Sequence, residues 1–266
     1  MLNRKIDNEI DAHFSNSKKA LFLTGARQVG KTYSIRKYAK LHGLNLIEFN
    51  FLLQPEAMDI INGAGDVKEL LLRISAYSRV PLVRSKTLIF FDEVQECPDV
   101  MTWVKALVDE GSYIYALSGS LLGVELKDIR SVPVGYMSEM QVYPMDFEEF
   151  VRAVGVPENV LDAVKKSWSE KTLVDAYIHE KMMQLFQLYI IVGGMPAAVQ
   201  TYIDSNNIQN VVKEQRDIIN LYKKDIARYD QDVRKKLYIN EVFDLIPSEL
   251  NAKNKRFILQ RLNENT

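Results

Sequence analysis

The sequence predicts an α/β fold, in which a parallel β-sheet flanked by helices is followed by an all-helical region. A glycine-rich loop, residues 25–32, stands between an apolar run and an amphipathic stretch. A second apolar run, residues 88–91, ends in two acids. Continuous apolar runs of this length are typical of strands buried on both faces of a parallel sheet. After about residue 157 the apolar residues recur at helical spacing, and no alternating strand is evident.

The N-terminal elements follow from hydrophobic periodicity. Ile6, Ile10 and Phe14 share one face of a helix predicted over residues 3–16. The next predicted elements are a strand over 19–24, a helix from the loop to Leu41, a strand over 44–51 and helices over 53–62 and 66–78. The apolar run that ends in two acids is then the third strand.

The second half of the α/β part continues this alternation. A helix that ends at Gly111 precedes a fourth strand over 113–117, which leads into Ser118-Gly119-Ser120. Residues 123–137 show few periodic signals and are expected to form a loop. A fifth strand over 139–143 ends at Pro144, and a helix follows.

The helical part is expected to begin near residue 155. Long helices are predicted over 171–192 and 206–229. Gly193 and Gly194 would stop the first of them, and Pro196 suits the first turn of the helix that follows.

Composition limits the classes of protein that fit. The chain has 266 residues, of which 47% are hydrophobic and 26% charged, a balance typical of soluble globular proteins. A formal net charge of −1 gives no basic field toward nucleic acid or anionic membrane. A single cysteine, Cys97, excludes an intramolecular disulfide. The N-terminus resembles no signal peptide, and the longest apolar run, 188–199, is shorter than the ~20 residues of a membrane span. We therefore expect a cytoplasmic protein.

The glycine-rich loop matches G-x-x-x-x-G-K-[ST], the pattern of a phosphate-binding loop. Its glycines allow backbone N–H groups to approach phosphate oxygens, and Lys31 would supply positive charge to the β- and γ-phosphates. The Thr32 hydroxyl suits Mg²⁺, which prefers oxygen ligands. The predicted nucleotide-binding residues are Gly25, Ala26, Arg27, Gln28, Val29, Gly30, Lys31, Thr32 and Tyr33.

Polar residues follow two of the predicted strands where open α/β sheets place their ligands. Asp92 would hold Mg²⁺, through water, and Glu93 would orient the attacking water. The alternative is a solvated strand end or a helix-capping pair. Ser118 and Ser120 would either sense the γ-phosphate or cap a helix.

Five motifs in this order resemble the AAA-type, STAND-related ATP-binding proteins of bacteria and archaea, in which an AAA core precedes a C-terminal domain of unknown function. The motifs are residues 25–32, residues 88–93 with Gln95, and residues 118–120, 143–150 and 193–196. The resemblance covers nearly the whole chain. It implies five parallel strands in the order 5-1-4-3-2, a γ-phosphate sensor at Ser118 or Ser120, and Pro196 near the adenine. Plain helix initiation is the alternative for Pro196.

The chain departs from the family pattern in two places. Gly135-Tyr136 stands where the family usually carries Gly-Arg, so any phosphate-directed role of that arginine would be vacant and the enzyme slow. Arg130 or Arg228 would stand in for it, or both are surface charges. The chain also stops at Thr266, where family members continue.

We therefore expect three domains: a P-loop ATPase core over 1–155, a helical lid over 156–245 and the start of a truncated C-terminal domain over 246–266.

The predicted function is that of an ATP-binding, Mg²⁺-dependent ATPase that acts as a nucleotide-driven conformational switch. Its catalytic residues would be Glu93, Lys31, Ser118 and Ser120, with Thr32 and Asp92 at the metal. The alternative is a nucleotide-dependent interaction module with negligible hydrolysis. A kinase would need an acceptor site and an arginine-rich lid, and neither is found. DNA binding rests only on basic residues at 253–261, which a solvated helix face also explains. The expected partner is an unknown protein or the missing domain, and no membrane is expected.

Overall fold

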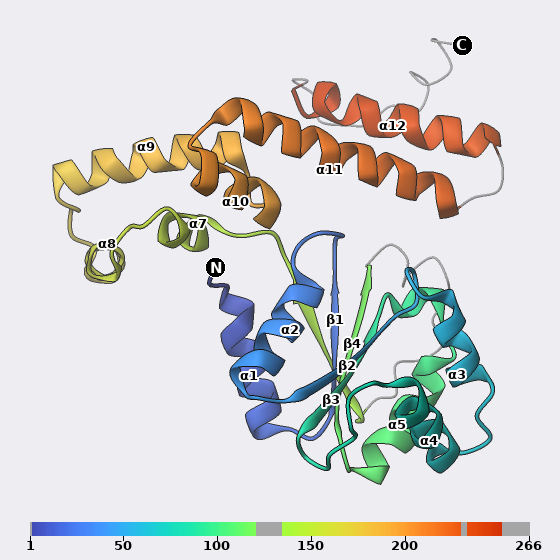
Figure 1. Ribbon diagram of the computed structural model, residues 1–266. Coiled ribbons are helices and arrows are strands. Elements are labelled where there is room, and N and C mark those ends of the chain that lie inside the picture. Colours follow the sequence, from blue (N-terminus) through green and yellow to red (C-terminus); the bar gives the residue numbers. More distant parts are fainter. Residues whose placement is uncertain (1, 121–134, 230–232, 252–266) are drawn as a thin grey trace. The chain divides into compact units, whose positions relative to one another are not determined.

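The computed structural model describes residues 2–120, 135–229 and 233–251 (Figure 1). The chain divides into two compact units, Met1–Val211 and Val212–Thr266. The first unit holds the sheet, the helices that flank it and helices α7 to α10. The boundary falls inside helix α11. The domain limits predicted at residues 155 and 245 stay predictions.

Five parallel strands form one sheet in the order β2-β3-β4-β1-β5, which confirms the order predicted from the family resemblance. The strands are β1 (Ala20–Gly25), β2 (Asn45–Asn50), β3 (Thr87–Asp92), β4 (Ile114–Ser120) and β5 (Met137–Val142). Gly25, the last residue of β1, is paired with Ser120 on one side and with Val142 on the other. The carboxyl ends of the strands therefore meet at one edge of the sheet.

Helices cover both faces of the sheet (Figure 1). One face carries α1 (Lys5–Asn16) and α2 (Lys31–Leu41); the other carries α3 (Met58–Asn62), α4 (Val67–Tyr77) and α5 (Val100–Glu110), with short helices η1 (Pro55–Ala57) and η2 (Val94–Glu96) at strand ends. All six residues of β1 are buried, because Leu21 and Leu23 pack toward α1 and α2 while Phe22 packs toward the other layer. The continuous apolar run follows from this two-sided burial.

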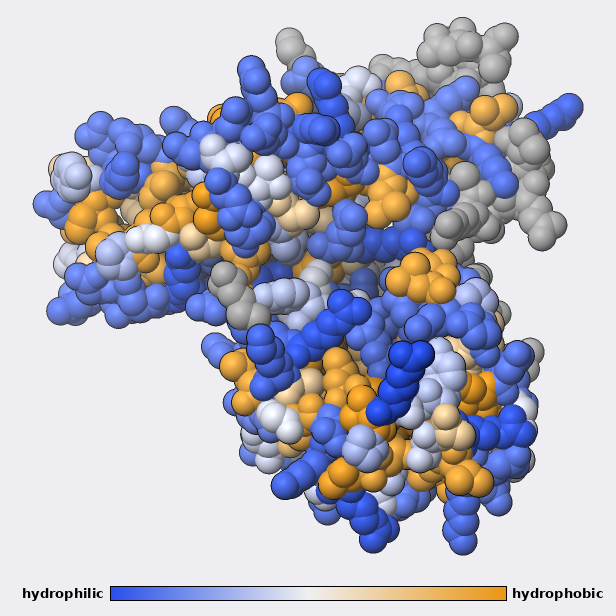
Figure 2. Space-filling model, viewed as in Figure 1, coloured by the Kyte–Doolittle hydropathy of each residue, from blue (hydrophilic) through white to orange (hydrophobic). Residues whose placement is uncertain are grey.

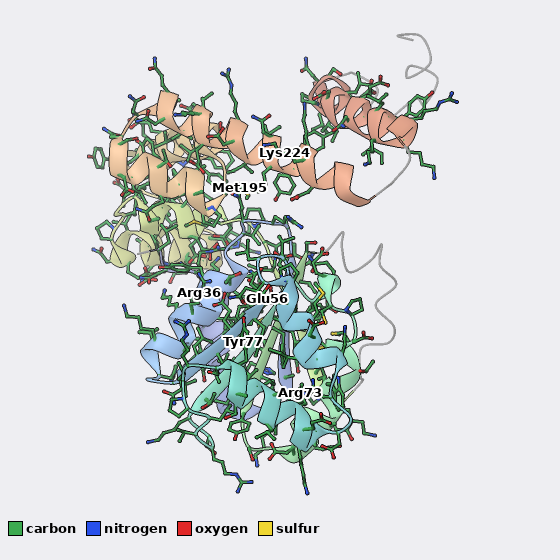
Figure 3. All side chains as sticks on the ribbon, turned by 45° about the vertical axis from the view of Figure 1, so that its right-hand side comes forward. Arg36, Glu56, Arg73, Tyr77, Met195 and Lys224 are labelled. Atoms are coloured by element: carbon green, nitrogen blue, oxygen red, sulfur yellow. The ribbon has the colours of Figure 1, made fainter. Side chains whose placement is uncertain are left out.

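Two side chains labelled in Figure 3 illustrate how the layers are joined. Tyr77 of α4 stacks on Phe49 of β2, with ring centroids 5.4 Å apart. Arg36 of α2 forms a bidentate ion pair with Glu48 of β2, at 2.6 and 2.7 Å. An aromatic contact thus joins β2 to α4 on one face of the sheet, and an ion pair joins β2 to α2 on the other.

Four helices with a core of their own follow the sheet. They are α7 (Phe147–Ala153), α8 (Glu158–Glu170), α9 (Ala176–Val192) and α10 (Pro196–Ser205). Phe150, Val192 and Val199 are buried together in this core. The prediction of one helix over 171–192 was wrong in its start, because Lys171 ends α8 at a φ of 54° and Asp175 caps α9.

The connection between α9 and α10 is fixed to the end of the sheet. Gly194 accepts a hydrogen bond from Met145 N at 2.7 Å, and the Tyr189 hydroxyl donates to Met145 O at 2.8 Å. A Cβ on Gly194 would lie 2.2 Å from Met145 O, so only glycine allows this approach. The segment after β5 thereby sets where α10 begins.

The second unit holds most of α11 (Ile208–Tyr229) and all of α12 (Val233–Asn251). The helix predicted over 206–229 is therefore present. Lys223 of α11 and Asp244 of α12 form an ion pair. Pro247, expected to open a new domain, lies inside α12.

Across the described ranges, no single helix is long and apolar enough to cross a membrane. α9 and α10 reach that length and hydropathy only as a pair bent by 118°.

Candidate nucleotide-binding site

The loop of residues 25–32 lies directly against β5. Gly25 has a φ of +144°, and a Cβ there would lie 2.2 Å from the Val142 carbonyl oxygen. Val29 is fully buried, whereas Ala26 and Gln28 are exposed on the outer side of the loop. The loop is thus anchored at its two ends and open to solvent between them. The backbone of this loop and the N-terminus of α2 form a cradle suited to anions.

Lys31, the first residue of α2, turns its ammonium group into this loop. Nζ donates hydrogen bonds to Gly25 O at 3.0 Å and to Ala26 O at 2.8 Å, and the residue is only 5% exposed. Burial lowers the pKa of Lys31, while the nearby charges of Glu93 and Asp92 oppose that shift. The ammonium group is therefore confined to the place where the sequence predicts phosphate.

Asp92 ends β3 and lies 2% exposed among three donors. Its carboxylate accepts hydrogen bonds from Thr32 Oγ1 at 3.0 Å, from Asn50 Nδ2 at 2.8 Å and from Ser118 Oγ. Burial raises the pKa of Asp92, the Ser118 hydrogen bond opposes this, and the charge of Glu93 adds to it. The structure thus brings together Thr32, Asp92 and Ser118, three residues predicted from separate motifs.

Glu93 follows Asp92 in an unusual backbone conformation. Its φ of 58° is in the left-handed region, which is rare for a residue other than glycine, asparagine or aspartate. Such conformations cluster at functional sites, where the surroundings hold them in place. Its carboxylate accepts a hydrogen bond from Gln95 Nε2.

Ser118 and Ser120 both lie within β4 and are buried. Ser118 pairs with Leu23 in the sheet, and Ser120 pairs with Gly25, the first residue of the loop. Ser118 is connected to the site by its hydrogen bond to Asp92, and Ser120 by the pairing of its backbone with Gly25. The alternative role of a helix cap involves residues 121–134, which lie outside the described residues.

Pro196 and Tyr33 flank the loop. A Cβ built on Gly30 would lie 4.0 Å from Pro196 Cγ, so the first turn of α10 comes close to the loop. Met195, which precedes Pro196, packs against the core of the sheet and against the core of the helical region formed by α7 to α10. It is labelled in Figure 3. Tyr33, in the first turn of α2, is 44% exposed.

Arg4 is a neighbour of the loop that sequence reasoning missed. It is 8% exposed, and its guanidinium donates to Val29 O in the loop at 2.9 Å, to Tyr143 O at 2.7 Å and to Glu149 Oε1 of α7 at 3.0 Å. Asn50 was missed as well. A signal existed for Asn50, since it ends a parallel strand on the ligand side of the sheet. None existed for Arg4, whose partners lie up to 145 residues away.

Tyr136 lies at the opposite end of the sheet from the loop. Its carbonyl oxygen accepts from Ala20 N at 2.9 Å, beside the first residue of β1, and its ring packs against the core under Lys105 of α5. Gly25 is five residues further along β1, about 16 Å at ordinary strand rise. A side chain at position 136 therefore does not belong to this site in the same chain. Arg130 and the side chain of Arg228, proposed as substitutes, lie outside the described residues.

Cys97 has a structural role rather than a chemical one. Cys97 is buried, and burial raises its pKa to about 11, so the thiol stays protonated at neutral pH.

Among the described residues, no group of three or more histidine, cysteine or acidic side chains could hold a metal ion alone. Mg²⁺ bound with a nucleotide needs only one or two protein ligands, with phosphate and water completing its shell. The Asp92 carboxylate and the Thr32 hydroxyl fit that requirement.

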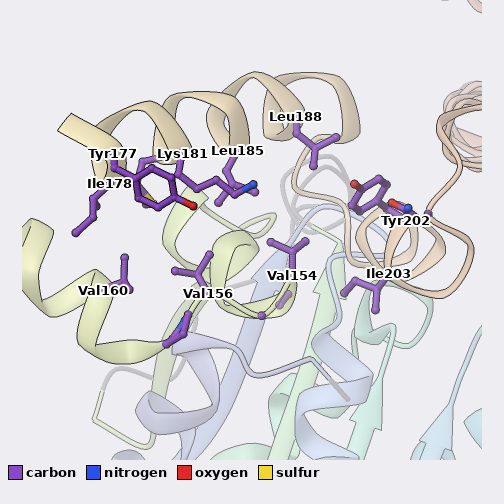
Figure 4. A pocket seen from close by; sticks show the side chains of 15 residues that line it. Val154, Val156, Val160, Tyr177, Ile178, Lys181, Leu185, Leu188, Tyr202 and Ile203 are labelled. Atoms are coloured by element: carbon purple, nitrogen blue, oxygen red, sulfur yellow. The ribbon is translucent and has the colours of Figure 1, made fainter. Parts of the chain in front are cut away.

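A separate hollow of about 660 Å³ lies in the helical region (Figure 4). Val154, Val156 and Val160 face Ile178 and Leu185 of α9 across it. Figure 2 shows apolar side chains gathered at the surface over α8 and α9, at the left of the view. This hollow contains none of the predicted site residues.

Comparisons with known proteins agree with this architecture. Residues 17–151 match the family model of the AAA domain, and residues 183–266 match that of a domain of unknown function. The first match spans half of the chain, so the protein belongs to the AAA domain family of nucleotide-binding P-loop ATPases. No curated protein matches the chain in sequence.

Solved structures with a similar arrangement are distant in sequence. A Walker-type ATPase of Pyrococcus abyssi is 16% identical, with a TM-score of 0.49, and the match covers 100% of this chain and 89% of that one. AMPPCP-bound DnaA from Aquifex aeolicus is 12% identical, with a TM-score of 0.43 and coverages of 97% and 80%. A STAND protein with a tetratricopeptide repeat sensor from Pyrococcus horikoshii is 11% identical, with a TM-score of 0.43 and coverages of 85% and 34%.

Proposed function

We propose that the protein binds ATP with Mg²⁺ at residues 25–32 and hydrolyses it, and that turnover moves the helical region as a conformational switch. The observation that carries the proposal is the meeting of Thr32 Oγ1 and Asp92 at 3.0 Å, with the buried Lys31 ammonium group in the same loop. A buried carboxylate, a hydroxyl and a confined cation are the groups needed to receive Mg²⁺ and phosphate.

Each side chain has a part in this chemistry. Lys31 would exchange its two loop carbonyls for β- and γ-phosphate oxygens, which are stronger acceptors. Thr32 and Asp92 would hold Mg²⁺, which neutralises charge that develops on the phosphates. Glu93 would orient the attacking water and receive its proton. Ser118, already bonded to Asp92, would report the γ-phosphate to β4 together with Ser120.

The adenine side of the site is proposed to lie at Pro196, next to Gly30. Residues 26–29 and Tyr33 complete the nucleotide contacts. We propose that the helical part of the chain that follows the α/β core acts as the lid. Closure of the lid on ATP is the switching step, and its partner is a protein or a further domain.

The test compares phosphate release and calorimetric nucleotide binding in the wild type, Glu93→Gln and Lys31→Ala. Wild type should bind and turn over ATP only with Mg²⁺. Glu93→Gln should bind ATP with similar affinity and lose turnover by 10²-fold or more, a loss at the level of general-base catalysis. Lys31→Ala should lose binding. Asp109→Asn, an exposed carboxylate on α5, is the matched control and should behave as wild type.

Two outcomes would contradict the proposal. Equal turnover in wild type and Glu93→Gln would remove Glu93 from the chemistry. Binding without turnover in the wild type would favour the alternative function, a nucleotide-dependent interaction module.

A further inference from the structure

Gln95 is a buried polar side chain beside the nucleotide-binding site, and it is neither a proposed phosphate contact nor a proposed metal ligand. It lies in η2, directly after β3 and Glu93, and it is 0% exposed. Nε2 donates to Glu93 Oε2, and Oε1 accepts from Ser120 N at 3.4 Å. Both ends of a fully buried amide are therefore used, one on the proposed base and one on the end of β4.

The chemistry of the two partners fixes the orientation of the amide. Ser120 N can only donate, so the oxygen of Gln95 must face it, and the NH₂ group must then face Glu93. Reversal would place two donors together at Ser120 and two acceptors together at Glu93. The arrangement is thus directional, with the donor aimed at the carboxylate.

We propose that Gln95 is a positioning residue that orients the Glu93 carboxylate and couples it to the end of β4. This inference rests on the proposed ATPase function. A glutamate side chain that is partly exposed has several rotamers, and one hydrogen bond from a buried amide selects among them.

The coupling follows from the sheet register. Ser120 is paired with Gly25, where the phosphate-binding loop begins. A shift of Gly25 and Ser120 on nucleotide binding would move the acceptor end of Gln95, and with it the donor that holds Glu93. Gln95 therefore links occupancy of the loop to the orientation of the base without touching the nucleotide.

The first test replaces Gln95 by methionine, which keeps its length and removes both hydrogen bonds. Because hydrogen bonds to charged groups contribute about 1.5–3 kcal/mol, kcat should fall by roughly 10- to 100-fold. KM for ATP and the calorimetric Kd should stay unchanged. Gln95→Met added to Glu93→Gln should lower kcat no further, because both changes disable one unit.

The second variant, Gln95→Glu, retains an acceptor for Ser120 and places a carboxylate beside Glu93. A carboxylate cannot donate to Glu93, so kcat should fall as in Gln95→Met while KM and the calorimetric Kd for ATP stay unchanged. Tyr115→Phe is the control for a conservative change in the buried part of the sheet, and its kcat should match wild type. A purely structural role for Gln95 would lower the unfolding temperature without lowering kcat selectively.

A third readout does not depend on turnover. In nucleotide-free protein, the Gln95 side-chain amide signal in ¹⁵N–¹H NMR spectra should shift in Glu93→Ala. Absence of turnover in the wild type would contradict the proposed ATPase function but not the hydrogen bond from Gln95 to Glu93. An unshifted amide signal, or full kcat in Gln95→Met of an active enzyme, would overturn the role of Gln95.

Discussion

Asp92 is a carboxylate that the fold buries among hydroxyl and amide donors. Its three hydrogen bonds stabilise the ionised form, but burial is the larger effect and raises its pKa. A folded-state pKa above the unfolded one means that ionisation costs stability, and this cost grows as pH rises through the folded value. The ionised Asp92 carboxylate therefore suits Mg²⁺, but its ionisation lowers the free energy of unfolding of the nucleotide-free protein.

We predict that Asp92→Asn stabilises the nucleotide-free protein at pH 7. The amide keeps the shape and removes the buried charge; a gain of about 1 kcal/mol raises the unfolding temperature by roughly 2–4 °C. The gain should shrink at lower pH, where wild-type Asp92 takes up a proton. Scanning calorimetry across pH measures it, and calorimetric titration should show loss of Mg²⁺-dependent ATP binding. A lower unfolding temperature at every pH would contradict this view of Asp92.

A substitution at Gly25 tests the packing of the loop against β5 without changing any charge. In Gly25→Ala the new methyl group would meet the Val142 carbonyl in a backbone conformation that alanine rarely adopts, so we expect a loss of about 3 kcal/mol or more. Gly43→Ala is the control, because φ is +61° there but no atom lies within 4 Å; it should cost about 1–2 kcal/mol. Urea unfolding compares the two, and similar losses would show that the contact with β5 is unimportant.

Arg4 joins four elements that are separate in sequence. It precedes α1, and its guanidinium contacts the loop after β1, the residue after β5 and Glu149 of α7. Glu149 is 5% exposed and also accepts from Lys5 N at 2.7 Å and Asp146 N at 3.0 Å. The start of α7, and with it the helical region of the first unit, is thereby fixed to the phosphate-binding loop.

We predict that Arg4→Met lowers the free energy of unfolding by about 3–5 kcal/mol, because it leaves the Glu149 charge buried without its cation. Glu149→Gln in the same chain should restore part of the loss. Arg36→Met, which breaks the exposed pair with Glu48, should cost no more than about 1 kcal/mol. Urea unfolding of the four proteins gives the comparison. If Arg4→Met cost as little as Arg36→Met, the coupling assigned to Arg4 would be wrong.

The elements that the sequence predicted best are those buried on two sides. β3 is a run of buried residues closed by an acid, so the strand could be anticipated from the sequence, while its place in the sheet followed from the family resemblance. The start of α9 could not, because Leu173 and Val174 extend the apolar pattern past the true boundary at Asp175. The contacts of Arg4 and Gln95 depend on tertiary approach, which periodicity does not encode.

Register also corrected one expectation drawn from the family. The resemblance implied a vacant phosphate role at Tyr136, but the carbonyl oxygen of this residue accepts from Ala20 N, about 16 Å along β1 from Gly25. Its aromatic ring is accounted for by packing against the core next to α5. Slow turnover therefore does not follow from this substitution within one chain.

At the scale of the first compact unit, the loop and the helical region share two connections. Arg4 joins the loop to α7, and Pro196 lies beside Gly30. Met145 and Gly194 then fix the segment before α7 to the turn before α10. If the adenine lies at Pro196 as proposed, a bound nucleotide touches the first turn of α10, which is then the part of the helical region best placed to respond.

We predict that a non-hydrolysable ATP analogue with Mg²⁺ slows amide hydrogen exchange at the start of α10, where Val199 N donates to Met195 O. At 100 times Kd, ligand stabilisation reaches about 2.7 kcal/mol, so exchange there should slow by up to roughly 100-fold. Mass spectrometry of peptides over 195–203 measures it, with peptides over α4 as the internal reference and Lys31→Ala as the variant that should not respond. Protection of the loop alone, without α10, would separate nucleotide binding from the proposed switch, because a ligand shifts only those equilibria in which it contacts the two states differently.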